Sequence, residues 1–269
     1  MKTSFPVNGG AGVVLPMALK SKEVRAIALP RVIGHRGAAI VAPENTLAAF
    51  RAAAGMGVTM IEFDVKLTAN GYPVVFHDDT LSRTTNGHGR MRDITLEELE
   101  RLDAGFWFEP AFAGEQVPTL EVALSFLISV GMSVNIELKP CPETDEQTAQ
   151  IAVAAAMAYW PRDRLPPLLS SFSRRALRTA RAVAPAWPQG LIVDRLPDDW
   201  HEAAVALRIV ALHCQERHLS PVVVAEVKRA GLAVLAWTVN DPQRAQTLWR
   251  WGVDAVITDA PDEILAAVS

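Results

Sequence analysis

Short runs of apolar, mostly β-branched residues recur along the chain and predict its β-strands. They lie at 31–35, 59–65, 73–77, 133–138, 167–171, 189–193, 208–213, 232–238 and 254–258. Most alternate with stretches in which apolar residues repeat at helical spacing, and these predict amphipathic helices at 45–56, 119–130, 144–159, 173–183, 220–230 and 241–251. Strand alternating with helix is typical of a parallel sheet.

One strand candidate is set apart by the short segment that precedes it. Only seven residues separate 59–65 from 73–77, whereas a parallel crossover takes about a dozen or more. Asn70-Gly71 within that segment is a strong hairpin signal. We therefore expect 73–77 to fold back antiparallel on 59–65 and to bring His77 close to Asp64. The other strands predict an α/β fold, a TIM (β/α)8 barrel.

Residues 79–117 do not fit the alternation of strand and helix. They contain a capping-box start to a short helix at 93–99 and the aromatic cluster Phe106-Trp107-Phe108. A segment of this length with its own helix and aromatic residues is typical of an insertion. We expect it to cover one rim of the active site, as a lid or a substrate wall.

Residues 1–29 are expected to form an N-terminal extension that precedes one domain at 30–269. The first residues faintly resemble a signal peptide, but Asn8-Gly9-Gly10 and Pro16 interrupt the apolar stretch and no small-x-small cleavage site follows. No apolar run approaches the roughly 18 residues that a membrane helix needs. We therefore expect no integral membrane association.

The composition is that of one enzyme-sized domain. The chain has 269 residues, of which 50% are hydrophobic and 21% are charged, and a barrel of this kind takes about 250 residues. Its net charge is -4 and it has no Lys/Arg block, so we expect no nucleic-acid partner. The two cysteines, Cys141 and Cys214, are far apart in sequence, which favours reduced thiols and a cytoplasmic location.

Three carboxylates occur at the carboxyl ends of predicted strands, where a barrel presents its chemistry. Glu62 and Asp64 are two positions apart in one strand, so both side chains point into the barrel mouth. Glu137 arrives from a neighbouring strand. These acids would repel one another without a cation, and hard oxygen ligands favour one divalent ion, Mg2+ or Ca2+, with Mn2+ possible. The alternative is that they are surface carboxylates on strand ends.

Two histidines, His35 and His77, flank the carboxylates and are expected to act as the catalytic acid and base. An acid, a base, oxygen ligands for a divalent cation and nearby cationic side chains together suit cleavage of a phosphate ester. For a phosphodiester, one proton must be taken from the attacking hydroxyl and another given to the departing alkoxide, and imidazole suits both near neutral pH. A lone histidine at a strand end would more often be structural. The remaining histidines are expected at the surface or in loops, although the third ends a predicted strand: His88, His201, His213 and His218.

Two cationic side chains, Arg36 and Lys139, are expected to bind the phosphate of the substrate. Arg36 follows His35 directly and can meet two phosphate oxygens in a fork, while Lys139 follows Glu137 by two and faces the same way. The alternative for each is an ordinary salt bridge, for example to Glu44 or Asp259.

Supporting positions are expected around these groups. We interpret Glu44 and Asn45 as bracing His35 and Arg36, and Asp78 as bracing His77 from behind. At the end of a later strand, Trp237 and Asn240 are expected to bind substrate, with the tryptophan as a wall beside a small polyol. For that pair the alternative is core packing plus a helix cap.

Taken in order, these motifs resemble the glycerophosphodiester phosphodiesterase family from about Val32 to the C-terminus. The resemblance rests on His35-Arg36-Gly37, Pro43-Glu44-Asn45-Thr46, Glu62-x-Asp64, His77-Asp78, Glu137-x-Lys139, Trp237-Thr238-Val239-Asn240 and 253–259. Asp103-Ala104-Gly105-x-Trp107-Phe108 with Pro118-Thr119-Leu120 is similar to the insertion of that family. The resemblance implies that the three carboxylates are the metal ligands. Cys141 is unusual near this region, and we expect it to be no ligand because soft thiolates suit neither Mg2+ nor Ca2+.

The expected activity is metal-dependent hydrolysis of small glycerophosphodiesters to glycerol 3-phosphate and an alcohol, in glycerol and lipid metabolism. Two alternatives remain, a lysophospholipase D-like phosphodiesterase and a non-catalytic phosphate-binding barrel. Lysolipid activity would call for an exposed apolar patch around Phe106, Trp107 and Phe108. Attack by the glycerol 2-hydroxyl through a cyclic phosphate is expected, with direct attack by water as the competitor. The head group, the native metal and the oligomeric state stay open.

Overall fold

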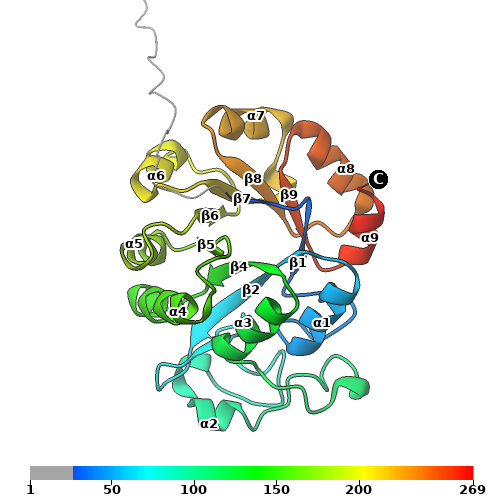
Figure 1. Ribbon diagram of the computed structural model, residues 1–269, viewed down its shortest axis with the longest axis vertical. Helices are drawn as coiled ribbons and strands as arrows, with labels where there is room; N and C mark the ends of the chain where they lie inside the picture. The colour runs from blue at the N-terminus through cyan, green and yellow to red at the C-terminus, as the bar shows by residue number, and fades with distance from the viewer. Residues whose placement is uncertain (1–26, 269) are drawn as a thin grey trace, which may run out of the picture.

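Eight parallel strands close into a barrel in the computed structural model, which describes residues 27–268 (Figure 1). The strands are β1 (Val32–His35), β2 (Met60–Leu67), β4 (Ser133–Leu138), β5 (Leu168–Ser171), β6 (Gln189–Val193), β7 (Ala211–Gln215), β8 (Ala233–Trp237) and β9 (Ala255–Thr258). Their order is β1-β9-β8-β7-β6-β5-β4-β2, and pairing of β1 with β2 closes the ring. The predicted TIM barrel is confirmed. Most of the predicted N-terminal extension, residues 1–26, lies outside the described part of the chain.

The remaining strand, β3 (Pro73–Val75), forms the predicted hairpin with β2. It runs antiparallel, with Val75 opposite Val65 and Val74 opposite Lys66. One residue further, the amide of Phe76 donates to the carbonyl oxygen of Asp64 at 3.0 Å. The pairing thus carries the chain from opposite Leu67, at the carboxyl end of β2, back along that strand to Asp64, and His77 is the next residue.

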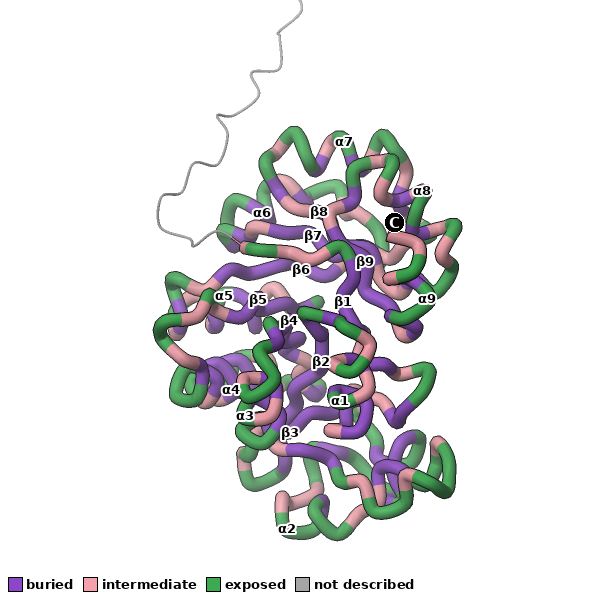
Figure 2. The backbone as a smooth tube through the Cα atoms, turned by 45° about the vertical axis from the view of Figure 1, so that its right-hand side comes forward, coloured by how far each residue is buried: buried purple, intermediate pink, exposed green. Residues whose placement is uncertain are grey.

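The helices cover the outside of the barrel. Six match predicted stretches: α1 (Leu47–Gly55), α3 (Leu120–Ser129), α4 (Asp145–Tyr159), α5 (Arg174–Val183), α7 (Pro221–Arg229) and α8 (Pro242–Trp251). Two more were not predicted, α6 (Trp200–Leu207) and α9 (Pro261–Ala266). Figure 2 shows buried strands at the centre and exposed residues on the outer faces of the helices. The main apolar core therefore lies between the barrel and its ring of helices.

Strand β7 begins three residues later than the sequence pattern predicted. We expected a strand over 208–213, whereas α6 continues to Leu207 and Arg208 ends it with a left-handed backbone, φ 52°. The strand then runs from Ala211 to Gln215. His213, expected at the end of the strand, consequently lies in its middle and is fully buried, with 1% of its surface exposed. Its assignment to the surface or a loop was wrong.

The segment between β3 and α3 packs as a unit against the hairpin (Figure 1). It contains two 3-10 turns, η1 (Met91–Asp93) and η2 (Pro110–Phe112), and the short helix α2 (Leu96–Leu99), whose N-cap Thr95 makes the predicted capping box with Glu98. Its apolar cluster is built from Val74, Phe76, Leu81, Met91, Leu99, Ala104, Val117 and Cys141. No helix of the described residues is long and apolar enough to cross a membrane.

Candidate active site

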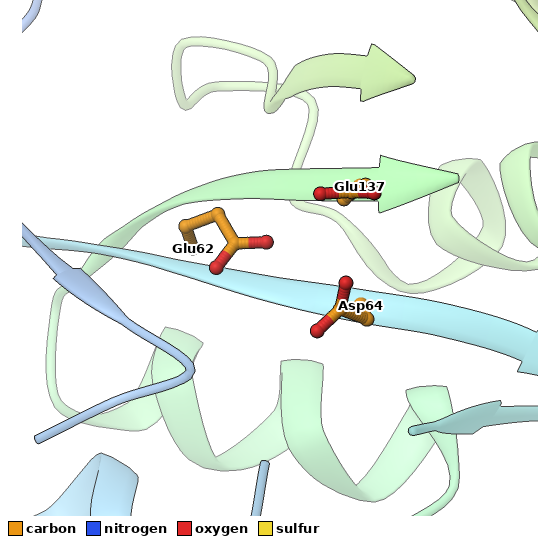
Figure 3. Close-up of side chains that lie close together, drawn as sticks. All are labelled: Glu62, Asp64 and Glu137. Carbon is orange, nitrogen blue, oxygen red and sulfur yellow. The ribbon is translucent and has the colours of Figure 1, made fainter. Parts of the chain in front are cut away.

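The three predicted metal ligands converge from two neighbouring strands, β2 and β4. Glu62 and Asp64 come from β2 and Glu137 comes from β4, where it is the register partner of Asp64. One oxygen of each carboxylate lies within 4.8 Å of the others, and all three residues are buried. Figure 3 shows the carboxylates turned toward a common point between the two strands. The alternative of surface carboxylates on strand ends therefore does not describe them.

The three carboxylates are buried and repel one another, and the positive charges beside them do not fully compensate. Burial and the negative charges of Asp64 and Glu137 raise the pKa of Glu62 well above its ordinary value. Burial and Asp64 raise the pKa of Glu137 to about 7. Burial alone would also raise the pKa of Asp64, but Arg36 and other nearby cations lower it below its usual range. Glu62 Oε1 has no partner among the described residues. This set of hard oxygen donors fits one divalent cation.

The two predicted phosphate-binding residues, Arg36 and Lys139, both lie beside the carboxylate cluster. The Nζ of Lys139 donates to Glu137 Oε1 at 2.8 Å and lies 3.7 Å from Asp64 Oδ1. The guanidinium of Arg36 donates to Glu44 Oε1 at 2.6 Å, and its Nε lies 3.3 Å from Asp64 Oδ2. The salt bridge between Arg36 and Glu44 that the sequence left open is thus present. Both cations also line the cavity above the carboxylates, so they remain candidates for binding phosphate.

His35, at the end of β1, is held by a carboxylate from the far end of the chain. Its Nδ1 lies 2.6 Å from Asp259 Oδ1, and its Nε2 points toward Glu62 Oε2 at 3.9 Å. Asn240 donates to the second oxygen of Asp259 at 2.8 Å and accepts from the amide of Asp259. Asn240 therefore supports the partner of His35, and it is not among the described residues that line the cavity.

His77 is held in the same way by the residue that follows it. Its Nδ1 lies 2.6 Å from Asp78 Oδ1. Arg83, from the segment after β3, donates to both oxygens of Asp78 at 2.6 and 2.8 Å and to both oxygens of Glu44 at 2.7 Å. Burial is the largest influence on His77 and lowers its pKa, although the negative charge of Asp64 opposes it. The interpretation of Asp78 as a brace agrees with these contacts.

Asn45 contacts Arg36, as expected, and also one of the carboxylates. Its backbone amide donates to the carbonyl oxygen of Arg36 at 3.0 Å. Its side-chain amide donates to Asp64 Oδ2 at 2.9 Å, and its Oδ1 accepts from the amide of Asp64 at 3.4 Å. Its backbone is left-handed, with φ 59°, a conformation that asparagine tolerates well. Asn45 thus positions a carboxylate and contacts Arg36, and Glu44 also braces Arg36. The next residue, Thr46, caps helix α1, and its side chain accepts from the amide of Ala49.

An aromatic wall closes one side of the site. Trp237, at the end of β8, meets Phe172 edge to face with ring centroids 5.6 Å apart, and the Nζ of Lys139 lies 5.2 Å from the centre of the Phe172 ring. The Trp237 Nε1 is buried without a partner among the described residues. Both rings border a cavity of about 200 Å3 lined by His35, Arg36, Glu62, His77, Asn135, Glu137, Lys139, Phe172, Ile192, His213, Trp237, Thr238 and Ile257.

Sequence reasoning missed several of these residues. Arg83 and Phe172 carry no motif of their own, and only their neighbours in space give them a role. Asp259 lies in the closing segment that supported the resemblance, yet it appeared only as a possible salt-bridge partner. Asn135 and His213 occupy inward-facing strand positions and line the cavity. For Asn135 the signal was available, because it precedes Glu137 by two residues in the same strand.

Comparison with known proteins identifies the family. The model of the glycerophosphoryl diester phosphodiesterase family matches residues 35–263. The chain is 37% identical over 238 residues to a glycerophosphodiester phosphodiesterase of Caldanaerobacter subterraneus, covering 88% of this chain and 97% of that protein. This chain belongs to the glycerophosphoryl diester phosphodiesterase family. The resemblance found in the sequence, and with it the prediction of an enzyme of this class, is confirmed.

Solved structures of phosphodiesterases share the fold. A phosphodiesterase of Oleispira antarctica, solved in complex with the product sn-glycerol-3-phosphate, is 42% identical with a TM-score of 0.87, covering 89% of this chain and 97% of that one. A glycerophosphodiester phosphodiesterase of Agrobacterium tumefaciens is 29% identical with a TM-score of 0.74, covering 88% of this chain and 100% of that one. The family assignment therefore rests on sequence and on fold.

Proposed function

We propose that this family member hydrolyses small glycerophosphodiesters to glycerol 3-phosphate and an alcohol, with one divalent cation held by Glu62, Asp64 and Glu137. The observation that carries the proposal is the convergence of these buried carboxylates with two carboxylate-held histidines around one cavity. The Oleispira antarctica relative with bound sn-glycerol-3-phosphate supports this substrate class. A bound Mg2+, Ca2+ or Mn2+ would supply positive charge that stabilises the transition state.

In this proposal Arg36 and Lys139 bind the phosphate. Each cation lies beside the carboxylate cluster and faces the cavity, so phosphate oxygens bound to them would lie next to both histidines. The pKa of Lys139 would fall on burial, but Asp64 and Glu137 raise it above its ordinary value, so the amine keeps its charge. Two positively charged side chains beside the cavity favour a dianionic transition state over a neutral ligand.

His35 and His77 serve as the proton-transfer pair. Each imidazole is oriented through Nδ1 by a carboxylate at 2.6 Å, which leaves Nε2 available to the substrate. One Nε2 removes the proton of the attacking hydroxyl, and the other gives a proton to the departing alkoxide. Asp259 and Asp78 orient the rings, and Asn240 and Arg83 fix those carboxylates in turn. Asn240 thus acts through Asp259 rather than on the substrate.

The nucleophile in this proposal is the hydroxyl on glycerol carbon 2. It is already tethered to the phosphorus, and a well-aligned intramolecular nucleophile can have an effective molarity of about 10^5 M. Its oxygen forms the new bond to phosphorus, the bond to the alcohol breaks, and a five-membered cyclic phosphate results. Water then opens the ring to glycerol 3-phosphate. Direct attack by water is the competing route.

A lysophospholipase D-like activity is the second candidate, and one observation favours it. Phe106 is 60% exposed and Trp107 is 39% exposed. Both lie in residues 79–117, which we propose are an insertion in a catalytic domain that spans 30–269. Exposed aromatic side chains of this kind can receive an acyl chain.

The free, buried thiols of Cys141 and Cys214 support a cytoplasmic location for either activity.

The deciding experiment assays glycerophosphocholine, glycerophosphoethanolamine, glycerophosphoglycerol and a lysolipid side by side, each with Mg2+, Ca2+ or Mn2+. We expect rapid turnover of at least one water-soluble diester and weak turnover of the lysolipid. If the lysolipid is turned over fastest, the second candidate, the lysophospholipase D-like activity, is the correct function. Tight binding of phosphate esters with no turnover under any metal would instead make the barrel a phosphate-binding protein.

A further inference from the structure

The barrel interior next to the carboxylates contains an apolar cluster and a group of polar side chains. The apolar cluster includes Ile33, Met60, Leu168, Ala211, Leu235, Ala255 and Ile257. Three uncharged polar side chains point inward from β4, β5 and β7, and we refer to Asn135, Ser170 and His213 as the polar layer. Their inward direction follows from the strand register, because Asn135 pairs with Glu62 and Ser170 pairs with Glu137. Ser170 also pairs with Gly190, and His213 pairs with Ile192 two residues further along β6, so His213 points the same way.

Every side chain of the polar layer is buried and lacks a partner. Asn135 and Ser170 are 0% exposed and His213 is 1% exposed. Both side-chain atoms of Asn135, both ring nitrogens of His213 and the Ser170 hydroxyl have no hydrogen-bond partner among the described residues. Unsatisfied polar atoms are rare inside native proteins. Five of them on three inward-facing residues of one barrel indicate a site for a ligand that can hydrogen-bond.

The polar layer opens into the active-site cavity. Asn135 and His213 line the same cavity as His35 and Glu137. Asn135 precedes Glu137 by two residues in β4, so it lies about 7 Å deeper in the barrel. The glycine at 190 makes room for the imidazole, because a Cβ at that position would collide with His213 Nε2. A ligand bound at the carboxylates can therefore extend downward onto this layer.

The chemistry of the layer suits a neutral hydroxyl group. Burial lowers the pKa of His213 to about 3, so its ring is uncharged near neutral pH and offers one donor and one acceptor. Asn135 likewise offers both. An ion would be poorly compensated here, whereas a hydroxyl group can donate to one partner and accept from another.

We propose that Asn135 and His213 form a subsite for the terminal hydroxyl of the glycerol moiety, the one on the carbon furthest from the phosphate. This inference rests on the proposed function, since it names the part of that substrate which enters the polar layer. The subsite distinguishes glycerol esters from phosphate esters that lack this hydroxyl. Asn135 and His213 are then specificity-determining residues, separate from the residues that bind phosphate.

The test measures binding of two phosphate monoesters by calorimetry in the presence of Ca2+. Glycerol 3-phosphate is compared with 2-hydroxypropyl phosphate, which lacks only the terminal hydroxyl oxygen. We expect the unchanged protein to prefer glycerol 3-phosphate by about ten-fold or more, because a site built to bind a hydroxyl rejects the analogue without it. Asn135→Leu and His213→Phe should each reduce the preference to within about two-fold while the affinity for 2-hydroxypropyl phosphate is kept. His218→Phe, outside the barrel interior, is the matched control and should retain the preference.

Several outcomes would overturn the subsite. An unchanged protein without preference, a variant that keeps the preference, or a variant that weakens both ligands by the same factor would each do so. Asn135→Leu carries the test alone if His213→Phe does not fold. The proposed function can fail independently of the subsite. In that case the protein would not turn over glycerophosphodiesters but would still prefer glycerol 3-phosphate.

Discussion

The burial of His213 predicts that the protein loses stability in mild acid. Its pKa is lowered from 6.5 to about 3 in the folded protein, and burial is the cause. The unfolded chain therefore binds a proton at this residue below about pH 6.5, whereas the folded protein does not until about pH 3. Stability from this residue is complete above pH 6.5 and falls as the pH drops through that window.

The magnitude follows from the width of the window. Each pKa unit corresponds to about 1.4 kcal/mol, so a change from pH 7 to pH 5 should cost about 2 kcal/mol through His213. His77, whose pKa is also lowered, acts in the same direction. The variant His213→Phe isolates the buried residue, because His77 contributes equally to both proteins. We expect the free energy of unfolding to fall by about 2 kcal/mol less in the variant than in the unchanged protein.

Urea unfolding followed by tryptophan fluorescence at pH 7 and pH 5, with chelator present throughout, measures this difference. The relevant quantity is the change between the two pH values, so a general loss of packing in the variant does not affect it. His218→Phe should behave as the unchanged protein does. Equal losses in the unchanged protein and in His213→Phe would refute the argument, since His213 would then be protonated to the same extent in the folded and unfolded states.

The remaining predictions concern catalysis. Excess chelator should abolish turnover, and so should Asp64→Ala. Adding back Mg2+ or Ca2+ should restore the activity of the unchanged protein but not that of the variant. Full activity in chelator would contradict the metal assignment. His35→Ala and His77→Ala should each lower kcat by about two to four orders of magnitude with metal affinity largely kept, and near-normal turnover in either would make that histidine structural. A substrate analogue without the glycerol 2-hydroxyl should bind as an inhibitor, and its normal turnover would exclude the cyclic route.

Much of the barrel could be predicted because its signals are local. The alternation of strand and helix follows from residue periodicity, and the hairpin follows from the short segment before β3 and from Asn70-Gly71. The common direction of Glu62 and Asp64 follows from their spacing in one strand. The position of β7 was predicted less well, because the left-handed Arg208 that ends α6 is no glycine and leaves no mark in the hydrophobic pattern.

What only the tertiary structure decided is which distant residues meet. Asp259 reaches His35 across 224 residues, because barrel closure places β9 beside β1. Arg83 joins Glu44 to Asp78 because the segment after β3 folds over the β1–α1 loop. His213 faces the cavity through strand register rather than through any motif. A sequence determines residue types and local periodicity, whereas ring closure fixes the neighbours that set charge, burial and chemistry.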